Sequence, residues 1–334
     1  MREPAQTGFR PRHATTHHAF VLQHHISKYK ACGKKLYCCF IDFAKAYDCV
    51  PREKLWQRLF DIGVRGKMLH AIKSLYDVGV DMSIKLDVGV LDPINTAVGV
   101  KQGCPLSPLL FGLYIEGLET YVKSKLPQAG PMCGGVRMAM LMYADDTAVL
   151  ANSAAELQQL LDCIQEWCNE HGMTINVHKT EIVVFNTTAN ALSQLGTRWS
   201  IGGMHVKVSQ HFKYLGIYFH FSSGAAYGLQ KAAQRGRFAV ACLHRKLADL
   251  DVGADVALTL HLYSSMVQPA LLYGCEVWGQ HCLKLADPTT SSNVQVEQVH
   301  RNFLRHTLRL RRCSAVWTLY REAGMYHVQH ACMQ

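Results

Sequence analysis

The amino-acid sequence predicts an α+β core that is followed by a helical appendage. Strand-like and helix-like segments alternate as far as residue 222, and only helical periodicity follows from residue 224 onward. The chain has 334 residues, of which 49% are hydrophobic, so it can bury a sizeable core and form two or three subdomains.

The first expected element is a helix over residues 14–31. Thr15 or Thr16 is placed to cap its first turn, and apolar residues recur along one face at helical spacing. Gly33 is placed to end it, because glycine readily adopts the left-handed conformation that closes many helices.

Residues 35–43 predict an apolar strand that carries a single acid, Asp42, near its end. Pro51 then opens two helical stretches that reach Tyr76, since proline is favoured in the first turn of a helix. Residues 80–100 resemble a hairpin.

A further helix is expected over residues 107–126, followed by two short strands over residues 138–151. The two strands meet at Ala144, Asp145 and Asp146, so that two adjacent carboxylates interrupt an otherwise apolar run. Such a placement is costly unless a partner compensates for the charges.

The next helix covers residues 153–171, with Ser153 and Glu156 in a capping-box pattern and Gly172 at its end. The expected buried stripe comprises Leu157, Leu160, Leu161, Ile164 and Trp167. Strands over residues 173–185 and 205–221 complete the core, and the helical part has a loop near residues 250–256 and a Ser/Thr-rich break at residues 287–293.

Composition favours an intracellular protein with a polyanionic partner. The net charge is +10, which suits nucleic acid better than a membrane surface. The 13 cysteines are scattered without a Cys-x-x-Cys pair, which indicates reduced thiols. No secretory signal and no membrane-spanning stretch is recognisable, so we expect a nuclear or cytoplasmic location, neither secreted nor membrane-bound.

The acids at the strand ends suggest a metal site. If the strand before Asp42 lies beside the hairpin, then Asp42, Asp145 and Asp146 converge at one point of a sheet. Magnesium prefers oxygen ligands, and two such ions stabilise the attacking and leaving oxygens in phosphoryl transfer. The alternative is that Asp42 caps a turn and the paired acids form an Asp-rich hairpin loop.

Five blocks occur in an order and at spacings that resemble the palm motifs of reverse transcriptases from non-LTR (LINE-type) retrotransposons. They are FIDFAKAYD (40–48), KQGCPLSPLLFGLYIEGLE (101–119), YADD (143–146), GMTINVHKTEIVVF (172–185) and FKYLGIYF (212–219). QTGFRPRHATTHHAFVLQHHI (6–26) is similar to the last fingers motif of that family. ALLYGCEVWG (270–279) and VEQVHRNFLRHTLRLRR (296–312) are similar to the region beyond its thumb.

The resemblance implies a right-hand polymerase, whose palm is an antiparallel sheet with helices packed on one face. The implied domains are an incomplete fingers region (residues 1–35), the palm (36–222), a helical thumb (223–285) and a basic helical extension (286–334). The upstream part of the fingers is missing from the chain, which leaves retention of activity open.

The resemblance also implies RNA-directed DNA polymerase activity. The partners would be an RNA template, a DNA primer and dNTPs, and the cofactor two Mg²⁺ ions, with Mn²⁺ as a substitute. Asp42 and Asp145 match the family's metal ligands, Asp146 matches the third acid, and Lys179 matches a catalytic lysine near the leaving pyrophosphate.

Two further groups of residues match binding positions of the family. The nucleotide-binding group comprises Arg10, Phe43, Tyr47, Gln102 and Gly103, of which Tyr47 would exclude a 2′-hydroxyl. The primer and template group comprises Ser107, Pro108, Tyr214, Leu215, Gly216, Lys231 and Arg235. Arg301, Arg305 and Arg309 are spaced to form one basic helical face that suits phosphate contact, although such faces are often merely solvated.

Other classes of function remain open from the sequence. A catalytically inactive remnant could bind nucleic acid or only fold. A viral RNA-dependent RNA polymerase shares the palm acids, but Tyr47 and the QGCPLSP block (102–108) disfavour it. An intron-encoded reverse transcriptase also shares the palm, and only the C-terminal blocks favour the LINE type.

Overall fold

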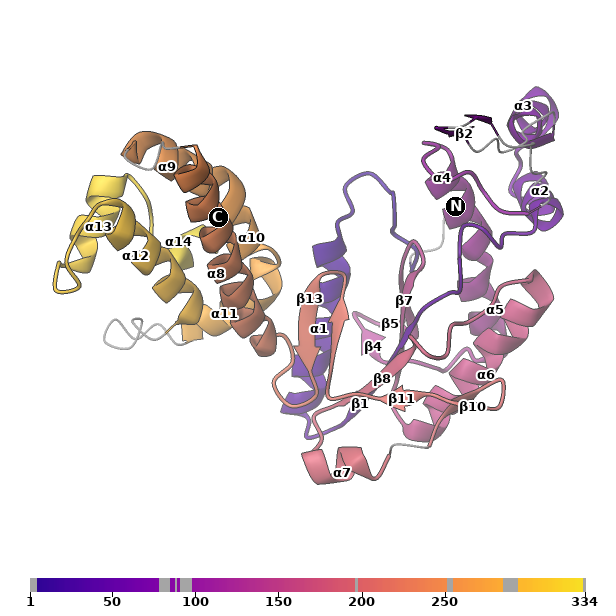
Figure 1. Cartoon of the computed structure of the whole chain (residues 1–334). Helices are drawn as coiled ribbons and strands as arrows, with labels where there is room; N and C mark the ends of the chain where they lie inside the picture. Colours follow the sequence, from indigo (N-terminus) through magenta and orange to yellow (C-terminus); the bar gives the residue numbers. More distant parts are fainter. Residues whose placement is uncertain are drawn as a thin grey trace. The chain divides into compact units, whose positions relative to one another are not determined.

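The computed structural model describes residues 5–77, 85–87, 89–90, 98–195, 198–250, 255–284 and 294–332 (Figure 1). The chain divides into two compact units. Unit 1 comprises Met1–His18 and Lys28–Gln210, and unit 2 comprises Ala19–Ser27 and His211–Gln334. The first helix, α1 (Thr15–Ala31), contributes to both units. The finer division into fingers, palm, thumb and extension remains a prediction.

Unit 1 is built around a five-stranded sheet with the strand order β11-β8-β1-β7-β6. Strands β1, β7, β8 and β11 are labelled in Figure 1. Its strands are β1 (Leu36–Ile41), β6 (Met140–Tyr143), β7 (Asp146–Ala151), β8 (Glu181–Phe185) and β11 (Lys207–Val208). The pairs β8–β1, β1–β7 and β7–β6 are antiparallel, as predicted, whereas β11 runs parallel to β8. The apolar sequence of β1 is buried on both faces, which makes this strand the centre of the unit.

The helices of unit 1 follow the predicted order along the chain, except that the short helix α7 was not predicted. They are α2 (Arg52–Asp61), α3 (Gly66–Asp77), α4 (Ser107–Ile115), α5 (Gly117–Lys125), α6 (Ala154–His171) and α7 (Ala189–Ser193). Small ladders are formed by β2 (Lys85–Leu86) with β3 (Gly89–Val90), β4 (Met132–Cys133) with β5 (Val136–Arg137), and β9 (Ser200–Ile201) with β10 (Met204–His205). Helix α6 packs on β1 and β7, and α5 packs on α6 (Figure 1).

Helix α6 begins and ends where the sequence predicts. The Ser153 hydroxyl accepts a hydrogen bond from the Glu156 amide at 3.1 Å, and Gly172 closes the helix with a φ of 69°. The Glu156 carboxylate accepts from the Asn152 amide at 2.8 Å. The predicted apolar stripe is fully buried, so it anchors the helix to the sheet.

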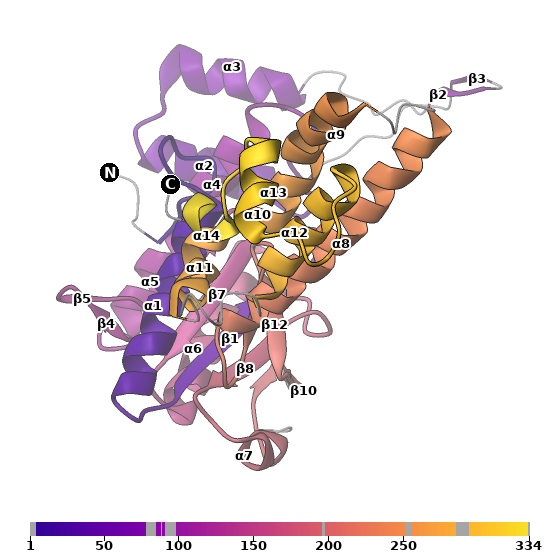
Figure 2. The ribbon, with the colours of Figure 1, turned by 90° about the vertical axis from the view of Figure 1, so that its left-hand side faces the viewer.

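Unit 2 combines a hairpin with a helical bundle. The hairpin strands are β12 (His211–Tyr214) and β13 (Ile217–His220). The helices are α8 (Ala226–Asp249), α9 (Val256–Leu262), the π-helical stretch Tyr263–Val267, α10 (Gln268–Leu272), α11 (Cys275–Lys284), α12 (Gln295–Thr307), α13 (Val316–Ala323) and α14 (Val328–Ala331) (Figure 2). The bundle core contains Leu243, Leu247, Tyr263, Val267, Phe303, Leu304 and Leu319.

Several element boundaries differ from the predictions. The residue that precedes α1 is Ala14, so neither Thr15 nor Thr16 is its cap. The segment predicted as one helix over residues 107–126 divides at Glu116 into α4 and α5. Only Glu181–Phe185 of the predicted strand over residues 173–185 is a strand, because the preceding residues form a turn.

Part of the predicted hairpin over residues 80–100 and the break at residues 287–293 lie outside the described residues. All 13 cysteines are free thiols, in agreement with the sequence prediction. Among the described helices, none is both long and apolar enough to cross a lipid bilayer.

Candidate active site

The three predicted acids lie at one end of the central sheet. Asp42 follows the end of β1, and Asp145 and Asp146 form the turn between β6 and β7 and the start of β7. Strands β1 and β7 are antiparallel neighbours, and Ile41 pairs with Thr147. Asp42 and Asp146 are the next residues beyond this pair, so the ladder brings acids from distant parts of the sequence together.

The acids influence one another electrostatically. Desolvation by the surrounding protein raises the pKa of Asp146 to about 6, with repulsion from Asp145 and then Asp42 as further causes. Desolvation also raises the pKa of Asp145; a backbone hydrogen bond opposes this shift and the charge of Asp42 adds to it. Asp145 and Asp146 are both exposed at the tip of the hairpin, although they interrupt an apolar run in the sequence. An ion or ligand can therefore reach them.

A turn from a third segment holds the backbone of Asp42. The Asn176 amide donates to the Asp42 carbonyl at 2.8 Å, and the Asp42 amide donates to the Thr180 hydroxyl at 3.2 Å. Thr180 is fully buried, and its hydroxyl donates in turn to the Asn176 carbonyl at 2.9 Å. Sequence reasoning missed Thr180, and an isolated threonine gives no pattern from which this role could be read.

A hollow of about 430 Å³ gathers predicted nucleotide and template residues from two distant blocks. It is lined by Tyr47, Lys101, Gln102, Gly103, Cys104, Pro105, Ser107 and Pro108. Tyr47 stacks on Phe111 with the ring centroids 4.7 Å apart. Partial burial raises the pKa of Tyr47, and the charge of Asp145 raises it further, so the Tyr47 ring is within electrostatic reach of the acids.

Backbone contacts fix the loop that carries Gln102 and Gly103. The Val100 amide donates to the Tyr47 carbonyl at 2.8 Å, and the Gln102 side chain donates to the Asp48 carboxylate at 2.9 Å. Gly103 has a φ of 81°, in the left-handed region that favours glycine, and it is exposed. The loop therefore presents an open backbone beside Tyr47.

Three residues that the sequence analysis assigned to the site do not line the hollow around Tyr47. Arg10 lines a different hollow, and its guanidinium forms an ion pair with the buried Glu116 at 2.8 Å. Phe43 is only 5% exposed, so its side chain offers little surface to a nucleotide. The Lys179 side chain is exposed on the turn that holds Asp42, and its catalytic role remains a prediction.

In unit 2, the predicted primer-gripping hairpin has a turn that two side chains fix. Leu215 and Gly216 have φ values of 46° and 84°. The Tyr273 hydroxyl donates to the Leu215 carbonyl at 2.9 Å, and Arg235 donates to the carbonyls of Gly216 and Tyr273, each at 3.2 Å. Arg235 therefore supports the hairpin instead of offering its guanidinium freely to phosphate.

Lys231, which was also predicted to contact primer or template, lies over the rings of Tyr218 and Tyr227. Its ammonium is 5.5 Å and 5.3 Å from the two ring centroids. Tyr214, by contrast, is buried in the core of its unit. A cation over half-buried aromatic rings is an arrangement that also suits single-stranded nucleic acid.

The predicted basic face of Arg301, Arg305 and Arg309 is wrong. Arg301 is only 8% exposed, and its guanidinium donates to the fully buried Glu297 at 2.9 Å. Arg309 lies beyond the end of α12. Helical spacing alone could not show that a carboxylate on the same helix, one turn earlier, would draw Arg301 into the interior.

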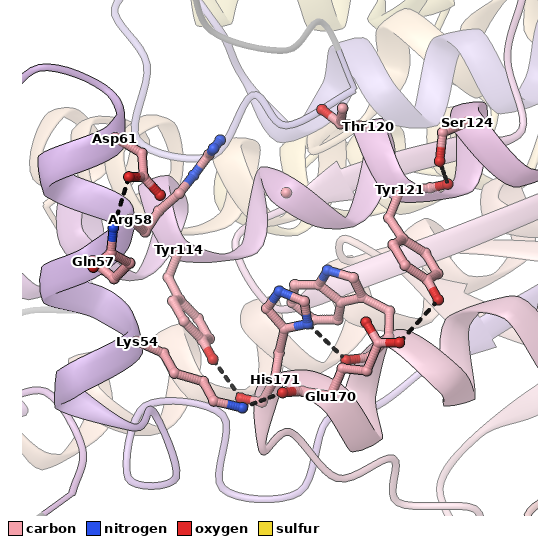
Figure 3. Close-up of a pocket in the computed structure, with 12 residues that line it drawn as sticks. Lys54, Gln57, Arg58, Asp61, Tyr114, Thr120, Tyr121, Ser124, Glu170 and His171 are labelled. Carbon is pink, nitrogen blue, oxygen red and sulfur yellow. Dashed lines mark hydrogen bonds between the residues drawn. The ribbon is translucent and has the colours of Figure 1, made fainter.

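A hollow of about 600 Å³ elsewhere in unit 1 is lined by residues of α2, α4, α5 and α6 (Figure 3). It contains none of the predicted site residues. Its polar groups largely satisfy one another: Gln57 donates to Asp61 at 2.8 Å, Lys54 donates to the Glu170 carbonyl, and Tyr114 donates to the His171 carbonyl (Figure 3). No ligand chemistry follows from this lining.

The acids at the hairpin tip have the donor chemistry that a divalent cation prefers. In the described ranges, no group of three or more His, Cys, Asp and Glu side chains is arranged so that it could hold a metal ion. Desolvation, with repulsion from neighbouring acids as a smaller cause, raises the pKa values of Asp145 and Asp146. Mg²⁺ usually takes one or two carboxylates and completes its shell with water and phosphate oxygens, so the three acids provide a suitable donor set.

Comparisons with known proteins agree with this architecture. The family model described as "Reverse transcriptase (RNA-dependent DNA polymerase)" matches residues 2–219. The chain belongs to the reverse transcriptase family, whose members use divalent metal ions.

The similar curated proteins come from non-LTR retrotransposons, as the sequence motifs predicted. The chain is 28% identical over 212 residues to a Pol polyprotein of the retrotransposable element R2 from Popillia japonica, with 62% of this chain and 34% of that protein covered. It is 27% identical over 293 residues to the RNA-directed DNA polymerase of the mobile element jockey from Drosophila melanogaster, with 82% and 29% covered. The chain thus spans about a third of the length of these relatives.

Among solved structures, telomerase from Candida albicans, determined with a fragment of telomeric RNA, is similar with a TM-score of 0.50. The match covers 97% of this chain and 55% of that chain at 12% identity. At this identity the likeness shows the fold alone. It supports the predicted polymerase-type α+β architecture.

Proposed function

We propose that this chain carries the polymerase centre of a LINE-type reverse transcriptase and extends a DNA primer on an RNA template with dNTPs. The observation that carries the proposal is the convergence of Asp42 with Asp145 and Asp146 across the β1–β7 ladder, beside the hollow that contains Tyr47. The family match and the retrotransposon relatives support the same reaction.

The three carboxylates would hold two Mg²⁺ ions, for which Mn²⁺ is the expected substitute. When bound, such ions activate the primer 3′-hydroxyl and neutralise the phosphate charge that develops in the transition state. The role of the chain is to align the oxygens of Asp42, Asp145 and Asp146 at the ends of strands β1 and β7.

The hollow beside the acids would receive the incoming nucleotide. Gly103 offers open backbone, and Tyr47, supported by Phe111, presents an aromatic ring where a ribose 2′-hydroxyl would clash. Ser107 and Pro108 begin α4, which would lie beneath the template. Lys179 would act near the leaving pyrophosphate, and Lys231 and the hairpin turn at Leu215 would contact the primer.

Primer extension tests the proposal. The full chain is incubated with a DNA primer annealed to an RNA template, dNTPs and Mg²⁺. We expect labelled DNA product from the wild type and none from Asp145→Asn. Asp61→Asn is the matched control, because Asp61 is an exposed acid on α2 that accepts only a local hydrogen bond from Gln57.

Two results would count against the proposal. Nucleic-acid binding without any synthesis by the wild type would favour the alternative of an inactive remnant. Equal synthesis by wild type and Asp145→Asn would show that these acids do not form the centre.

A further inference from the structure

The turn that carries Asp145 is hydrogen-bonded by the side chain of Gln6, near the start of the sequence. The segment Ala5–Gly8 lies beside β6, where the Thr7 amide donates to the Met142 carbonyl at 3.0 Å and the Met142 amide donates to the Ala5 carbonyl at 2.9 Å. This extra strand-like pairing brings Gln6 to the hairpin from 138 residues away in the sequence.

The Gln6 carboxamide binds both backbone polar groups of Ala144. Its Nε2 donates to the Ala144 carbonyl at 3.0 Å, and its Oε1 accepts from the Ala144 amide at 3.0 Å and from the Gly8 amide at 2.8 Å. Gln6 is only 2% exposed, so water does not compete strongly for these bonds.

Ala144 needs such support because its φ of 57° is unfavourable for a residue with a Cβ atom. A conformation of this kind persists where the surroundings over-determine it. Gly8 allows the close approach, since a Cβ there would lie 2.4 Å from the Ala144 amide nitrogen. The Thr7 hydroxyl bonds His18 Nε2 at 2.6 Å, and the His18 ring packs edge-on against Tyr143, which ties the same segment to the strand before the turn.

We propose that Gln6 is a positioning residue for the catalytic hairpin. By fixing the backbone amide and carbonyl of Ala144, it sets the direction in which the chain enters Asp145 and so places the Asp145 and Asp146 carboxylates for the divalent cations. The inference rests on the function proposed above. The sequence signal was a single glutamine at the start of the block that resembles the last fingers motif, and nothing in its spacing linked it to YADD.

The matched control lies in the same unit. Gln158 holds the backbone of Ser200 in the same manner, because its Nε2 donates to the Ser200 carbonyl at 2.9 Å and its Oε1 accepts from the Ser200 amide at 3.1 Å. Gln158→Met and Gln6→Met therefore each remove a pair of bonds to one backbone amide and carbonyl and keep a side chain of similar volume. Each also removes one further bond, from Gln158 to Asp162 at 2.7 Å or from the Gly8 amide to Gln6 at 2.8 Å. Only Gln6→Met should affect the acids.

Mn²⁺ binding to the full chain, followed by electron paramagnetic resonance in the absence of substrate, gives the primary measurement. We expect Gln6→Met to weaken Mn²⁺ binding about 10-fold or more, the range typical of residues that orient metal ligands. We expect kcat for primer extension to fall in parallel while the KM for dNTP changes little, and Gln158→Met to bind Mn²⁺ like the wild type.

A double variant separates positioning from general stability. Ala144→Gly removes the steric cost of the positive φ, so the turn depends less on Gln6. In the Ala144→Gly background, Gln6→Met should therefore cause a smaller loss of Mn²⁺ binding than it does in the wild type, which is a non-zero coupling in a double-mutant cycle. Should Gln6→Met fail to fold, Gly8→Ala takes its place, because its Cβ would lie 2.4 Å from the Ala144 amide nitrogen and 3.0 Å from Gln6 Oε1 and so disturb the contact between them.

The outcomes keep the two proposals apart. If Asp145→Asn loses Mn²⁺ binding but Gln6→Met and Gly8→Ala bind Mn²⁺ as the wild type does, the positioning role of Gln6 is overturned and the polymerase centre stands. If Asp145→Asn binds Mn²⁺ as tightly as the wild type, the proposed metal site itself fails.

Discussion

Asp42 and Asp146 are the first residues beyond the pair Ile41–Thr147 in the antiparallel ladder of β1 and β7. The charge of Asp42 contributes to a pKa of about 6 at Asp146, after the larger effects of desolvation and of Asp145. The sheet thus concentrates negative charge where strands β1 and β7 end. Such a concentration costs stability in the absence of a cation and creates affinity for one.

Stability without metal should fall with rising pH because of Asp146. Its pKa is about 6 in the folded chain against 3.8 for an unperturbed aspartate, so between these values the folded chain binds more protons than the unfolded chain. The free energy of unfolding therefore decreases as the pH rises from about 4 to about 6. Urea denaturation in EDTA across this range should show the decrease in the wild type and a weaker one in Asp146→Asn. Identical pH dependence in both proteins would contradict the assignment.

Discrimination against ribonucleotides should depend on the ring of Tyr47. Tyr47→Val removes the ring that stacks on Phe111, and we expect the preference for dNTP over rNTP in kcat/KM to fall about 10-fold or more. Tyr47→Phe is the matched control, since it keeps the ring and should keep the preference. Single-nucleotide incorporation with dNTP and rNTP provides the measurement. Unchanged selectivity in Tyr47→Val would show that Tyr47 does not contribute to the exclusion of ribonucleotides.

Arg10 should matter for stability through Glu116. Arg10→Met removes the guanidinium that forms an ion pair with the buried Glu116 carboxylate, and we expect a loss of about 3 kcal/mol in the free energy of unfolding. Arg10→Met with Glu116→Leu should recover most of this loss, because both charges are gone. Urea denaturation measures both variants. A raised KM for dNTP in the stable double variant would instead support the nucleotide role that the sequence predicted for Arg10.

Arg301 should behave as an interior residue and not as a phosphate contact. Arg301→Met leaves Glu297 buried without the guanidinium, so thermal and urea denaturation should show a loss of about 3 kcal/mol. The salt dependence of RNA binding should remain that of the wild type. Exposed Arg237 on α8 is the comparison, since an arginine that contacts phosphate changes the slope of log K against log salt by about 1. A changed slope in Arg301→Met would contradict the interior assignment.

Local sequence signals predicted most helices and the strands that carry the acids. The capping residue Ser153, the closing Gly172 and the buried stripe of α6 are confirmed because each depends on interactions within a few residues of chain. The start of α1 was predicted wrongly, since a threonine near a helix start does not decide which residue becomes the cap.

The residues of the candidate site also divide into those that local sequence motifs predicted and those whose contacts only the structure revealed. Asp42, Asp145 and Asp146 could be predicted because they occur at strand ends within motifs that recur in order. The contacts of Arg10 and Arg301 could not, because a buried carboxylate from another segment or an earlier turn decides where a guanidinium lies. The hydrogen bonds between Gln6 and Ala144 could not be predicted either, because they join segments that only strand pairing brings together.

By itself, the sequence determined the order of the polymerase motifs, the identity of the acids and the helices whose periodicity is local. Tertiary structure alone decided which strands pair, how the turn at Ala144 is held and which basic side chains are neutralised inside the protein. The physical reason is the separation along the sequence over which each interaction acts. Backbone propensity and capping act over a few residues, whereas burial and charge pairing depend on segments that are distant along the chain.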